Sequence, residues 1–296
     1  MRIAVLRGGP SLDYEQSLES GAVALGHLRE CHEVQEIFID KEGTWHRAGV
    51  PVSPERLAPH FDIFFNALHG DFGESGDAQH IMDNLGVAYT GSGSLASRGA
   101  YNKHLAKRIL SDAGVSVPMG AIITNDTDPV AASDEIFARM GGQYVVKPVT
   151  GGGGRGVQIV RSQQDLASAL TRGLLDWGEV LVEERLQGRE VKVAVIEGFR
   201  GQDFYTLLPI ESDSFICPAR LSPDEKYEAM RLAVKAYQIL GLSGYSTVDM
   251  ILTKKGFVLI ELDALPPLAP NYHLYRSLEA VGASMGELLN HVVRSA

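Results

Sequence analysis

A glycine-rich segment directly after an apolar, lysine-bearing strand is the feature that most constrains this chain. Residues 144–156 read Tyr-Val-Val-Lys-Pro-Val-Thr-Gly-Gly-Gly-Gly-Arg-Gly. Glycine accepts positive φ, so the five glycines of this segment can turn successive N–H groups towards an anion, and Lys147 adds fixed charge. The segment predicts a polyphosphate site; the alternative is a mobile hairpin tip.

The same glycines contain the pattern G-x-G-x-x-G at Gly151, Gly153 and Gly156, which also occurs in dinucleotide-binding turns. Such turns lead into a helix, whereas residues 157–160 alternate like a strand. A Walker A loop needs Gly-Lys followed by Ser or Thr, and the lysine here lies upstream instead. The pattern therefore predicts a glycine flap that joins two strands of a β-hairpin.

Composition restricts the class of protein. The chain has 296 residues, of which 45% are hydrophobic and 22% charged, as is typical of a globular protein. A net charge of −10 without a Lys/Arg run argues against a nucleic-acid partner. No apolar stretch reaches the roughly 18–20 residues of a membrane span. Cys31 and Cys217 are far apart and the first strand begins at once, which predicts reduced thiols and a cytoplasmic protein.

Alternating strand and helix patterns predict an α/β fold of three lobes, at residues 1–95, 96–186 and 187–296. Outside the glycine hairpin, the expected strands are 2–6, 33–39, 62–68, 87–89, 120–124, 180–184, 190–197, 206–210, 247–252 and 257–263. The expected helices are one ending at residue 29, then 77–85, 97–113, 129–140, 166–175, 223–240 and 284–293.

Acidic residues gather in the last predicted hairpin. If Thr253 pairs with Phe257 across its turn, counting back places Asp249 opposite Glu261. Asp263 shares the face of Glu261, because side chains at i and i+2 of a strand point the same way.

Three carboxylates on one apolar-flanked face repel each other and are compensated by a hard cation. An all-oxygen set suits Mg²⁺, or Mn²⁺, bridging to substrate phosphates. The alternative is a solvated face with ordinary surface charges. Together with the glycine flap, the hairpin predicts an ATP and Mg²⁺ site for phosphoryl transfer.

At this point the sequence resembles the ATP-grasp superfamily and, within it, the D-alanine:D-alanine ligase family. The resemblance covers nearly the whole chain. It is carried by the motifs Gly8-Gly9-Pro10-Ser11 through Ser20-Gly21, Leu68 through Gln79, Tyr89-Thr90-Gly91-Ser92-Gly93 and Asn102-Lys103. It implies an ATP-grasp fold with a Rossmann-like N-terminal lobe, a homodimer, and ATP-dependent ligation through an acyl phosphate.

The resemblance also implies roles for single residues. Those implied for ATP are Lys103, Lys147, Gly152, Gly153 and Gly154 at the phosphates, Glu183, Glu184 and Leu186 around the adenine, and Glu190 at the ribose. The implied metal ligands are Asp249, Glu261 and Asp263, the last where the family usually has asparagine. Glu184 stands where the family often has lysine.

Several positions depart from the family pattern on the acceptor side. The family's oxyanion arginine and glycine amide correspond to Thr247 and Pro267, and proline has no N–H. Gly153 replaces a serine, and His273-Leu274 replaces a serine-leucine pair. The chain between residues 207 and 217 is too short for the family's closing loop.

The predicted catalytic residues are accordingly mixed in origin. Asp13 replaces a glutamate that binds the first substrate's amino group, with Glu15, His69 and Glu74 close to it in the motifs. Cations that could replace lost contacts are Arg155, Arg220, His273 and Arg276.

The sequence therefore predicts an ATP-grasp carboxylate–amine ligase acting on D-alanine or another small amino acid. The alternatives are a non-catalytic nucleotide-binding homologue, acting as a sensor or partner subunit, and a dinucleotide-dependent oxidoreductase. The oxidoreductase fails if residues 157–160 form a strand.

Overall fold

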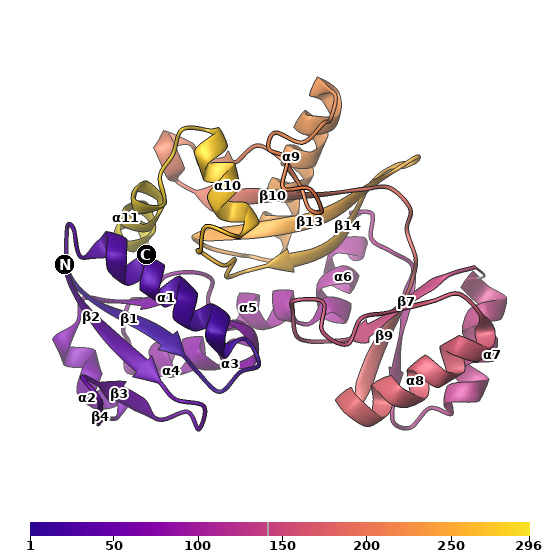
Figure 1. Cartoon of the computed structure of the whole chain (residues 1–296), viewed down its shortest axis with the longest axis horizontal. Helices are drawn as coiled ribbons and strands as arrows, with labels where there is room; N and C mark the ends of the chain where they lie inside the picture. Colours follow the sequence, from indigo (N-terminus) through magenta and orange to yellow (C-terminus); the bar gives the residue numbers. More distant parts are fainter. Residues whose placement is uncertain (141) are drawn as a thin grey trace.

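The structure is a computed structural model that describes residues 1–140 and 142–296. Its strands form three separate sheets, which follow one another along the chain. The N-terminal and central sheets lie at opposite ends of the molecule, and the C-terminal sheet bridges them (Figure 1). The α/β class expected from the sequence is confirmed.

The N-terminal sheet has the order β4-β3-β2-β1-β5, with β1 parallel to both β2 and β5. Its central strands are buried because α1 and α11 cover one face and α2 and α4 cover the other. The elements are β1 (Arg2–Gly8), α1 (Tyr14–Leu28), β2 (Glu33–Ile39), β3 (Trp45–Arg47), β4 (Val50–Pro51), α2 (Pro54–Leu57), η1 (Ala58–His60), β5 (Ile63–Asn66), α3 (Gly70–Glu74) and α4 (Asp77–Leu85).

The central sheet has the order β6-β9-β7-β8, and all its neighbours are antiparallel. Apolar residues of α7 and α8 pack on one face and form a core of their own. The elements are β6 (Gly120–Thr124), α7 (Pro129–Met140), β7 (Tyr144–Pro148), β8 (Gln158–Val160), α8 (Gln163–Trp177) and β9 (Glu179–Glu184).

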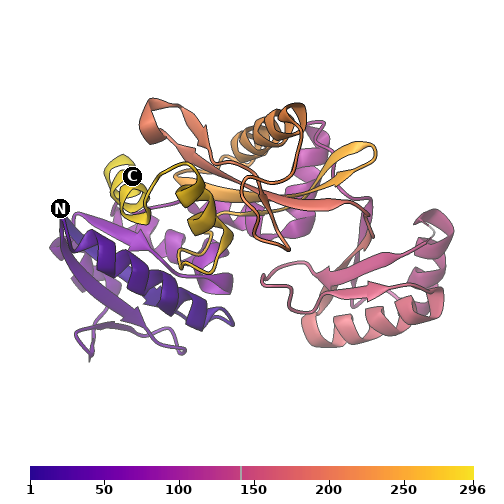
Figure 2. The same ribbon diagram turned by 45° about the horizontal axis from the view of Figure 1, so that its top comes forward.

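The C-terminal sheet has the order β11-β10-β13-β14, with β12 also paired to β10. Helix α9 packs on one face, while α10 and α11 connect the sheet to the N-terminal lobe (Figure 2). The elements are β10 (Arg189–Glu197), η2 (Phe199–Gly201), β11 (Phe204–Thr206), β12 (Ile210–Glu211), α9 (Pro223–Ile239), β13 (Tyr245–Thr253), β14 (Gly256–Asp263), α10 (His273–Ala280) and α11 (Met285–Ser295).

The helix expected over residues 97–113 is two helices, α5 (Ser94–Tyr101) and α6 (Lys103–Asp112). The chain breaks because Asn102 is extended and its side chain accepts a hydrogen bond from the Leu105 amide, capping α6. Both helices pack on the C-terminal sheet. The break places Lys103 at the first position of α6.

The register of the acidic hairpin differs from the prediction in two places that cancel. Thr253 pairs with Gly256 rather than Phe257, so the turn is one residue shorter. A β-bulge then follows, because Met250 pairs with Leu259 while Asp249 pairs with Glu261. The predicted pairing of Asp249 with Glu261 is therefore confirmed, although its derivation from the turn was wrong.

Other differences are local. Residues 87–89 do not form a full strand, since only Tyr89 bridges to Phe64. The strand expected at 206–210 is divided into β11 and β12, which pair separately with β10. Within the part of the chain that the structure describes, no helix has both the length and the apolar character needed to cross a bilayer.

Candidate active site

The glycine-rich segment connects β7 to β8, two antiparallel strands, as predicted. Residues 158–160 are a strand. A dinucleotide-binding turn would lead into a helix here, so that alternative is excluded. Gly151, Gly153, Gly154 and Gly156 have φ values of +95°, +63°, +71° and +71°. These are conformations that side chains rarely adopt, which explains why glycine recurs here.

Close packing fixes the end of this loop. A Cβ on Gly156 would lie 2.7 Å from Pro148 Cγ and 3.0 Å from Trp177 Nε1. Gly152 and Gly154 have no such neighbour within 4 Å. The loop is thus anchored at its far end and open in its middle, where backbone groups face two cavities.

The larger cavity, here called the flap cavity, measures about 550 Å³ and lies between the central and C-terminal sheets. Every residue predicted to bind ATP, except Gly153, lines it. These residues are Lys103, Lys147, Gly152, Gly154, Glu183, Glu184, Leu186 and Glu190. Val145, Val157, Ile159, Ile251 and Ile260 give it apolar walls, so it offers both an apolar slot and a charged end.

Two buried lysines surround Glu183 at the charged end. Lys147 Nζ lies 2.7 Å from Glu183 Oε2, and Lys107 pairs with the other carboxylate oxygen. Burial lowers the pKa of Lys107. Burial would lower the pKa of Lys147 too, but the charge and hydrogen bond of Glu183, together with the charge of Glu261, outweigh it and raise that pKa. Glu183 therefore holds the charge of Lys147, which lines the flap cavity, more firmly than that of Lys107.

The smaller cavity, here called the acidic cavity, measures about 120 Å³ and lies beside the flap cavity. Residues from all three lobes line it. They are Asp13, Gln16, His69, Glu74, Ser97, Tyr101, Gly151, Gly152, Gly153, Lys192, Asp249, Glu261, Leu262, Asp263 and Ala264. The three predicted metal ligands thus face the glycine loop across one space.

Burial and neighbouring charges shift the pKa values of the three carboxylates in different directions. Burial raises the pKa of Asp263 to about 7 and also raises that of Asp249. Burial would raise the pKa of Glu261 too, but Lys103 and Lys147 outweigh it and lower that pKa.

The three carboxylates fit a hard divalent cation chemically. Asp249 Oδ1 is buried without a hydrogen-bond partner, although Lys192 Nζ lies 3.0 Å away. Lys103 Nζ lies 3.1 Å from Glu261 Oε1. In the described chain, no three His, Cys, Asp or Glu side chains are arranged to bind one metal ion. Two of the three carboxylates are instead paired with lysines.

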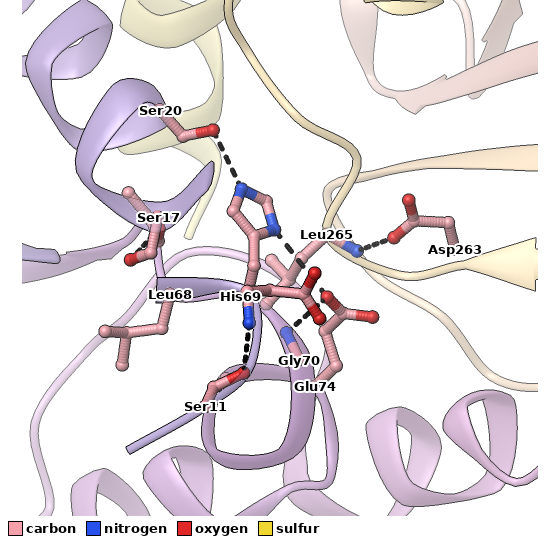
Figure 3. A network of polar contacts seen from close by, with 12 residues as sticks. Ser11, Ser17, Ser20, Leu68, His69, Gly70, Glu74, Asp263 and Leu265 are labelled. Carbon is pink, nitrogen blue, oxygen red and sulfur yellow. Dashed lines mark hydrogen bonds and ion pairs between the residues drawn. The ribbon is translucent and has the colours of Figure 1, made fainter. Parts of the chain in front are cut away.

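His69 and Glu74, which line the acidic cavity, belong to a buried polar network (Figure 3). His69 Nε2 lies 2.8 Å from Ser20 Oγ, and His69 Nδ1 lies 3.6 Å from Glu74 Oε1. Burial lowers the pKa of His69 and raises that of Glu74 to about 8. The Gly70 amide donates to Glu74, which leaves a neutral imidazole next to a carboxyl group that can hold a proton.

Some of the predicted catalytic residues and cations line neither cavity. Glu15 is exposed on the first turn of α1. Arg220 donates two hydrogen bonds to Glu211, and 71% of its side chain is exposed. Arg276 is exposed on α10. These positions give no support to a catalytic role. Glu15 and Arg276 are exposed to solvent, and the guanidinium of Arg220 is paired with Glu211.

His273 begins α10 and also lines neither cavity. It stacks on Phe215, with ring centroids 4.1 Å apart. Its Nε2 lies 2.9 Å from the Ser212 carbonyl oxygen. These contacts attach the short 212–216 segment to α10, so the structure gives His273 a packing role in this segment.

The structure also reveals residues that the sequence did not single out. Lys107 pairs with Glu183, and Lys192 enters the acidic cavity. A lysine four residues after Lys103 on one helix face was the available signal for Lys107. Nothing in the local sequence around Lys192 distinguishes it from a surface lysine.

Comparison with known proteins agrees with this geometry. The family described as D-ala D-ala ligase C-terminus matches residues 109–294. D-alanine–D-alanine ligases of Pseudothermotoga lettingae and Gluconobacter oxydans are 31% and 33% identical to this chain, with 100% of the chain and 99% of each relative covered.

Solved structures share the fold. The crystal structure of VanG D-Ala:D-Ser ligase from Enterococcus faecalis has a TM-score of 0.89 and 26% identity, covering 99% of this chain and 98% of that one. The D-alanine-D-alanine ligase from Coxiella burnetii has a TM-score of 0.87 at 23% identity, over 99% of this chain and 94% of that one. These proteins have the ATP-grasp fold, and this chain belongs to the D-alanine–D-alanine ligase family.

Proposed function

We propose that this protein is an ATP-dependent ligase that joins two small amino acids, with D-alanine as the leading candidate for the first. Family membership supports ligation over a non-catalytic nucleotide-binding role. The names of the relatives above contain D-alanine or D-serine. For the second substrate we therefore propose a small amino acid of this kind.

One observation carries this proposal. The flap cavity and the acidic cavity share Gly151, Gly152 and Glu261. A nucleotide in the flap cavity with its phosphates at the glycine loop would therefore present its terminal phosphate to the acidic cavity. Transfer to a substrate carboxylate held there needs the two groups to lie side by side, and the shared wall supplies that proximity.

On the nucleotide side, the apolar walls of the flap cavity suit a purine, and Lys103 and Lys147 suit its phosphates. Lys103 reaches the glycine loop already, since its ammonium donates to the Gly151 carbonyl. A phosphate at this place would replace that carbonyl as its partner. Glu190 also lines this cavity, where it suits the ribose hydroxyls.

Asp249, Glu261 and Asp263 would hold Mg²⁺, whose charge offsets that of the phosphates when it is bound. Ligases of this family use ATP and Mg²⁺. Lys103 and Lys192, which neutralise two of these carboxylates, would then be available to other anions.

The chemistry is a balanced two-step exchange. A carboxylate oxygen of the first amino acid attacks the terminal phosphorus of ATP, and ADP leaves. The amine of the second amino acid attacks the acyl carbon of the resulting acyl phosphate, the C=O electrons move to oxygen, and their return expels phosphate. The nitrogen loses a proton, and the products are ADP, phosphate and a dipeptide.

Asp13 and the His69–Glu74 pair suit the substrate's ammonium and its surroundings. Asp13 is nearly buried at the start of α1 and lines the acidic cavity. Gly70 allows this approach, because a Cβ there would lie 2.6 Å from Asp13 Oδ2. The ammonium would bind on this side of the cavity and the reacting carboxylate on the side of the C-terminal sheet.

Phosphate release tests the proposal. Purified protein with ATP and Mg²⁺ is incubated with single and paired D- and L-amino acids, with Asp249→Asn, which alters one proposed Mg²⁺ ligand, as the comparison variant. Release that depends on an amino acid, together with a dipeptide detected by mass spectrometry, supports ligation. Nucleotide binding without stimulated release across the panel supports the non-catalytic alternative.

Three further expectations belong to this proposal. We expect lobe boundaries near residues 95 and 186, a cytoplasmic location, and a homodimer without a nucleic-acid partner. Light scattering and limited proteolysis test the assembly and the boundaries.

A further inference from the structure

The acidic cavity contains an imbalance of charge. Asp13, Glu74, Asp249, Glu261 and Asp263 all line it. Among the described residues that form its walls, Lys192 is the one lysine or arginine, and burial lowers the pKa of the His69 imidazole. A substrate carboxylate entering this space would meet acidic residues on several sides, so the positions of Lys192 and of the proposed Mg²⁺ decide where it can lie.

Lys192 projects from β10 on the face that carries the acidic residues. It pairs across the strands with Asp249 of β13, and its Nζ lies 3.0 Å from Asp249 Oδ1. The contact lacks hydrogen-bond geometry, since that oxygen has no partner. Only 19% of the side chain is exposed. The ammonium is thus a desolvated charge with donors to spare.

The next rung of the sheet gives this ammonium room. Ala194 of β10 pairs with Thr247 of β13, and Thr247 pairs with Asp263 of β14. Both Ala194 and Thr247 are small and buried, and the Thr247 hydroxyl has no hydrogen-bond partner among the described residues. Neither residue of β10 or β13 on this rung brings a charge that competes with Lys192.

The other described cations near the glycine loop do not line the acidic cavity. Lys147 and Lys107 pair with Glu183 in the flap cavity, and Lys103 pairs with Glu261 at the boundary. Arg155 pairs with Asp13 on the opposite wall. Within the described chain, this leaves Lys192 as the cation that faces the acidic cavity from the side of the C-terminal sheet.

We propose that Lys192 is the catalytic cation of this ligase: its ammonium binds the carboxylate of the first amino acid and then the oxyanion of the tetrahedral intermediate. This rests on the ligase function proposed above. Lys192 stays protonated throughout, while the negative charge moves from the carboxylate to the acyl oxygen and leaves with phosphate. A cation on β10 would thereby supply the charge that Thr247 lacks.

Substitution of Lys192 by Met, Gln and Arg tests the assignment, with Lys254→Met on the exposed turn of the same sheet as the control. Lys192→Gln keeps a polar side chain with N–H donors on the side of Asp249 and removes the charge, so it also serves if Lys192→Met fails to fold. Turnover, the KM values for ATP and for the amino acid, and the Mg²⁺ dependence are measured for each.

Loss of one oxyanion donor typically costs about 10²- to 10³-fold in rate. We expect Lys192→Gln and Lys192→Met to lose at least about 10²-fold in kcat with the ATP KM preserved, and Lys192→Arg and Lys254→Met to remain active. Turnover within about threefold of the unaltered protein in Lys192→Gln would overturn the assignment. So would equal losses of ATP affinity and turnover, which indicate a structural role. Absence of amino-acid-dependent phosphate release from the unaltered protein would instead overturn the proposed function, and this assignment with it.

Discussion

Arg155 of the glycine loop forms an ion pair with Asp13 at the start of α1. The pair joins the central lobe to the N-terminal lobe across the acidic cavity. It also places a guanidinium at the carboxylate that we propose for the substrate's ammonium. Arg155 and the substrate should therefore compete for Asp13.

Substitution of Arg155 by Gln should lower the amino-acid KM. A partly exposed ion pair contributes up to about 1 kcal/mol, so removal of the competitor should lower KM by up to about fivefold. Steady-state kinetics measure this, with the exposed Arg161→Gln as the control. A rise in KM would show that Arg155 itself contacts the substrate.

Glu183→Gln should destabilise the central lobe strongly. Lys107 and Lys147 would be left buried without their shared carboxylate, and breaking a buried pair costs about 3–5 kcal/mol in free energy of unfolding. Denaturant unfolding followed by tryptophan fluorescence measures the change. Glu179→Gln at the start of the same strand, which is only half-buried, should lie near the unaltered protein.

The two carboxylates of β14 should respond differently to amide substitution. Asp263→Asn retains the oxygen that accepts a hydrogen bond from the Leu265 amide. It removes a carboxyl group whose pKa burial raises to about 7. We expect its turnover to stay within about tenfold of the unaltered protein, or about 1.4 kcal/mol, because the amide keeps an oxygen at this proposed Mg²⁺ ligand.

Glu261→Gln, in contrast, removes the partner of Lys103 and alters a wall of both cavities. Its turnover should fall by at least about 10²-fold. The comparison uses ADP release at saturating ATP and Mg²⁺. Equal activity of the two variants would contradict the assigned difference between these acids.

Glu74 should make the stability of the protein without ligands depend on pH. Burial raises its pKa to about 8 in the folded state from 4.5. Between these values the folded protein holds a proton that the unfolded chain releases, so stability is full below about pH 4.5 and is lost as pH rises through 8.

Glu74→Gln tests this, because the amide keeps an acceptor for the Gly70 amide and cannot ionise. We expect the Tm of the variant to exceed that of the unaltered protein by at least about 2 °C at pH 8.5, with a smaller gap at pH 5. Differential scanning calorimetry measures it, with the exposed Glu30→Gln as the control. A gap that is the same at both pH values would contradict the linkage.

The glycine hairpin and the acid face could be predicted because both depend on local pattern. Positive φ restricts the loop to glycine, and a two-residue period places Glu261 and Asp263 on one face. The bulge could not be predicted, since it follows from pairing with β13 rather than from the residues of β14 alone. The helix break at Asn102 was missed because the apolar period continues across it.

Lys192 and Arg220 show the limit of single-sequence reasoning about charges. Arg220 lies in a connecting segment and reads as free, but Glu211 takes its guanidinium. Lys192 reads as a surface lysine, and only the pairing of β10 with β13 brings it to Asp249. Whether a cation is neutralised or available depends on strand neighbours that are remote in sequence.

The bulge in β14 has a consequence for how the strand meets its ligand. Neighbours in a regular strand point to opposite faces, yet Ile260 and Glu261 both line the flap cavity. In the proposed complex, a single step of backbone would offer a hydrocarbon surface to the base and a carboxylate to the cations at the phosphate end. Deleting Ile260 would leave Asp249 opposite Glu261. The deletion would therefore remove the apolar contact proposed for the base and keep the pairing of the two carboxylates.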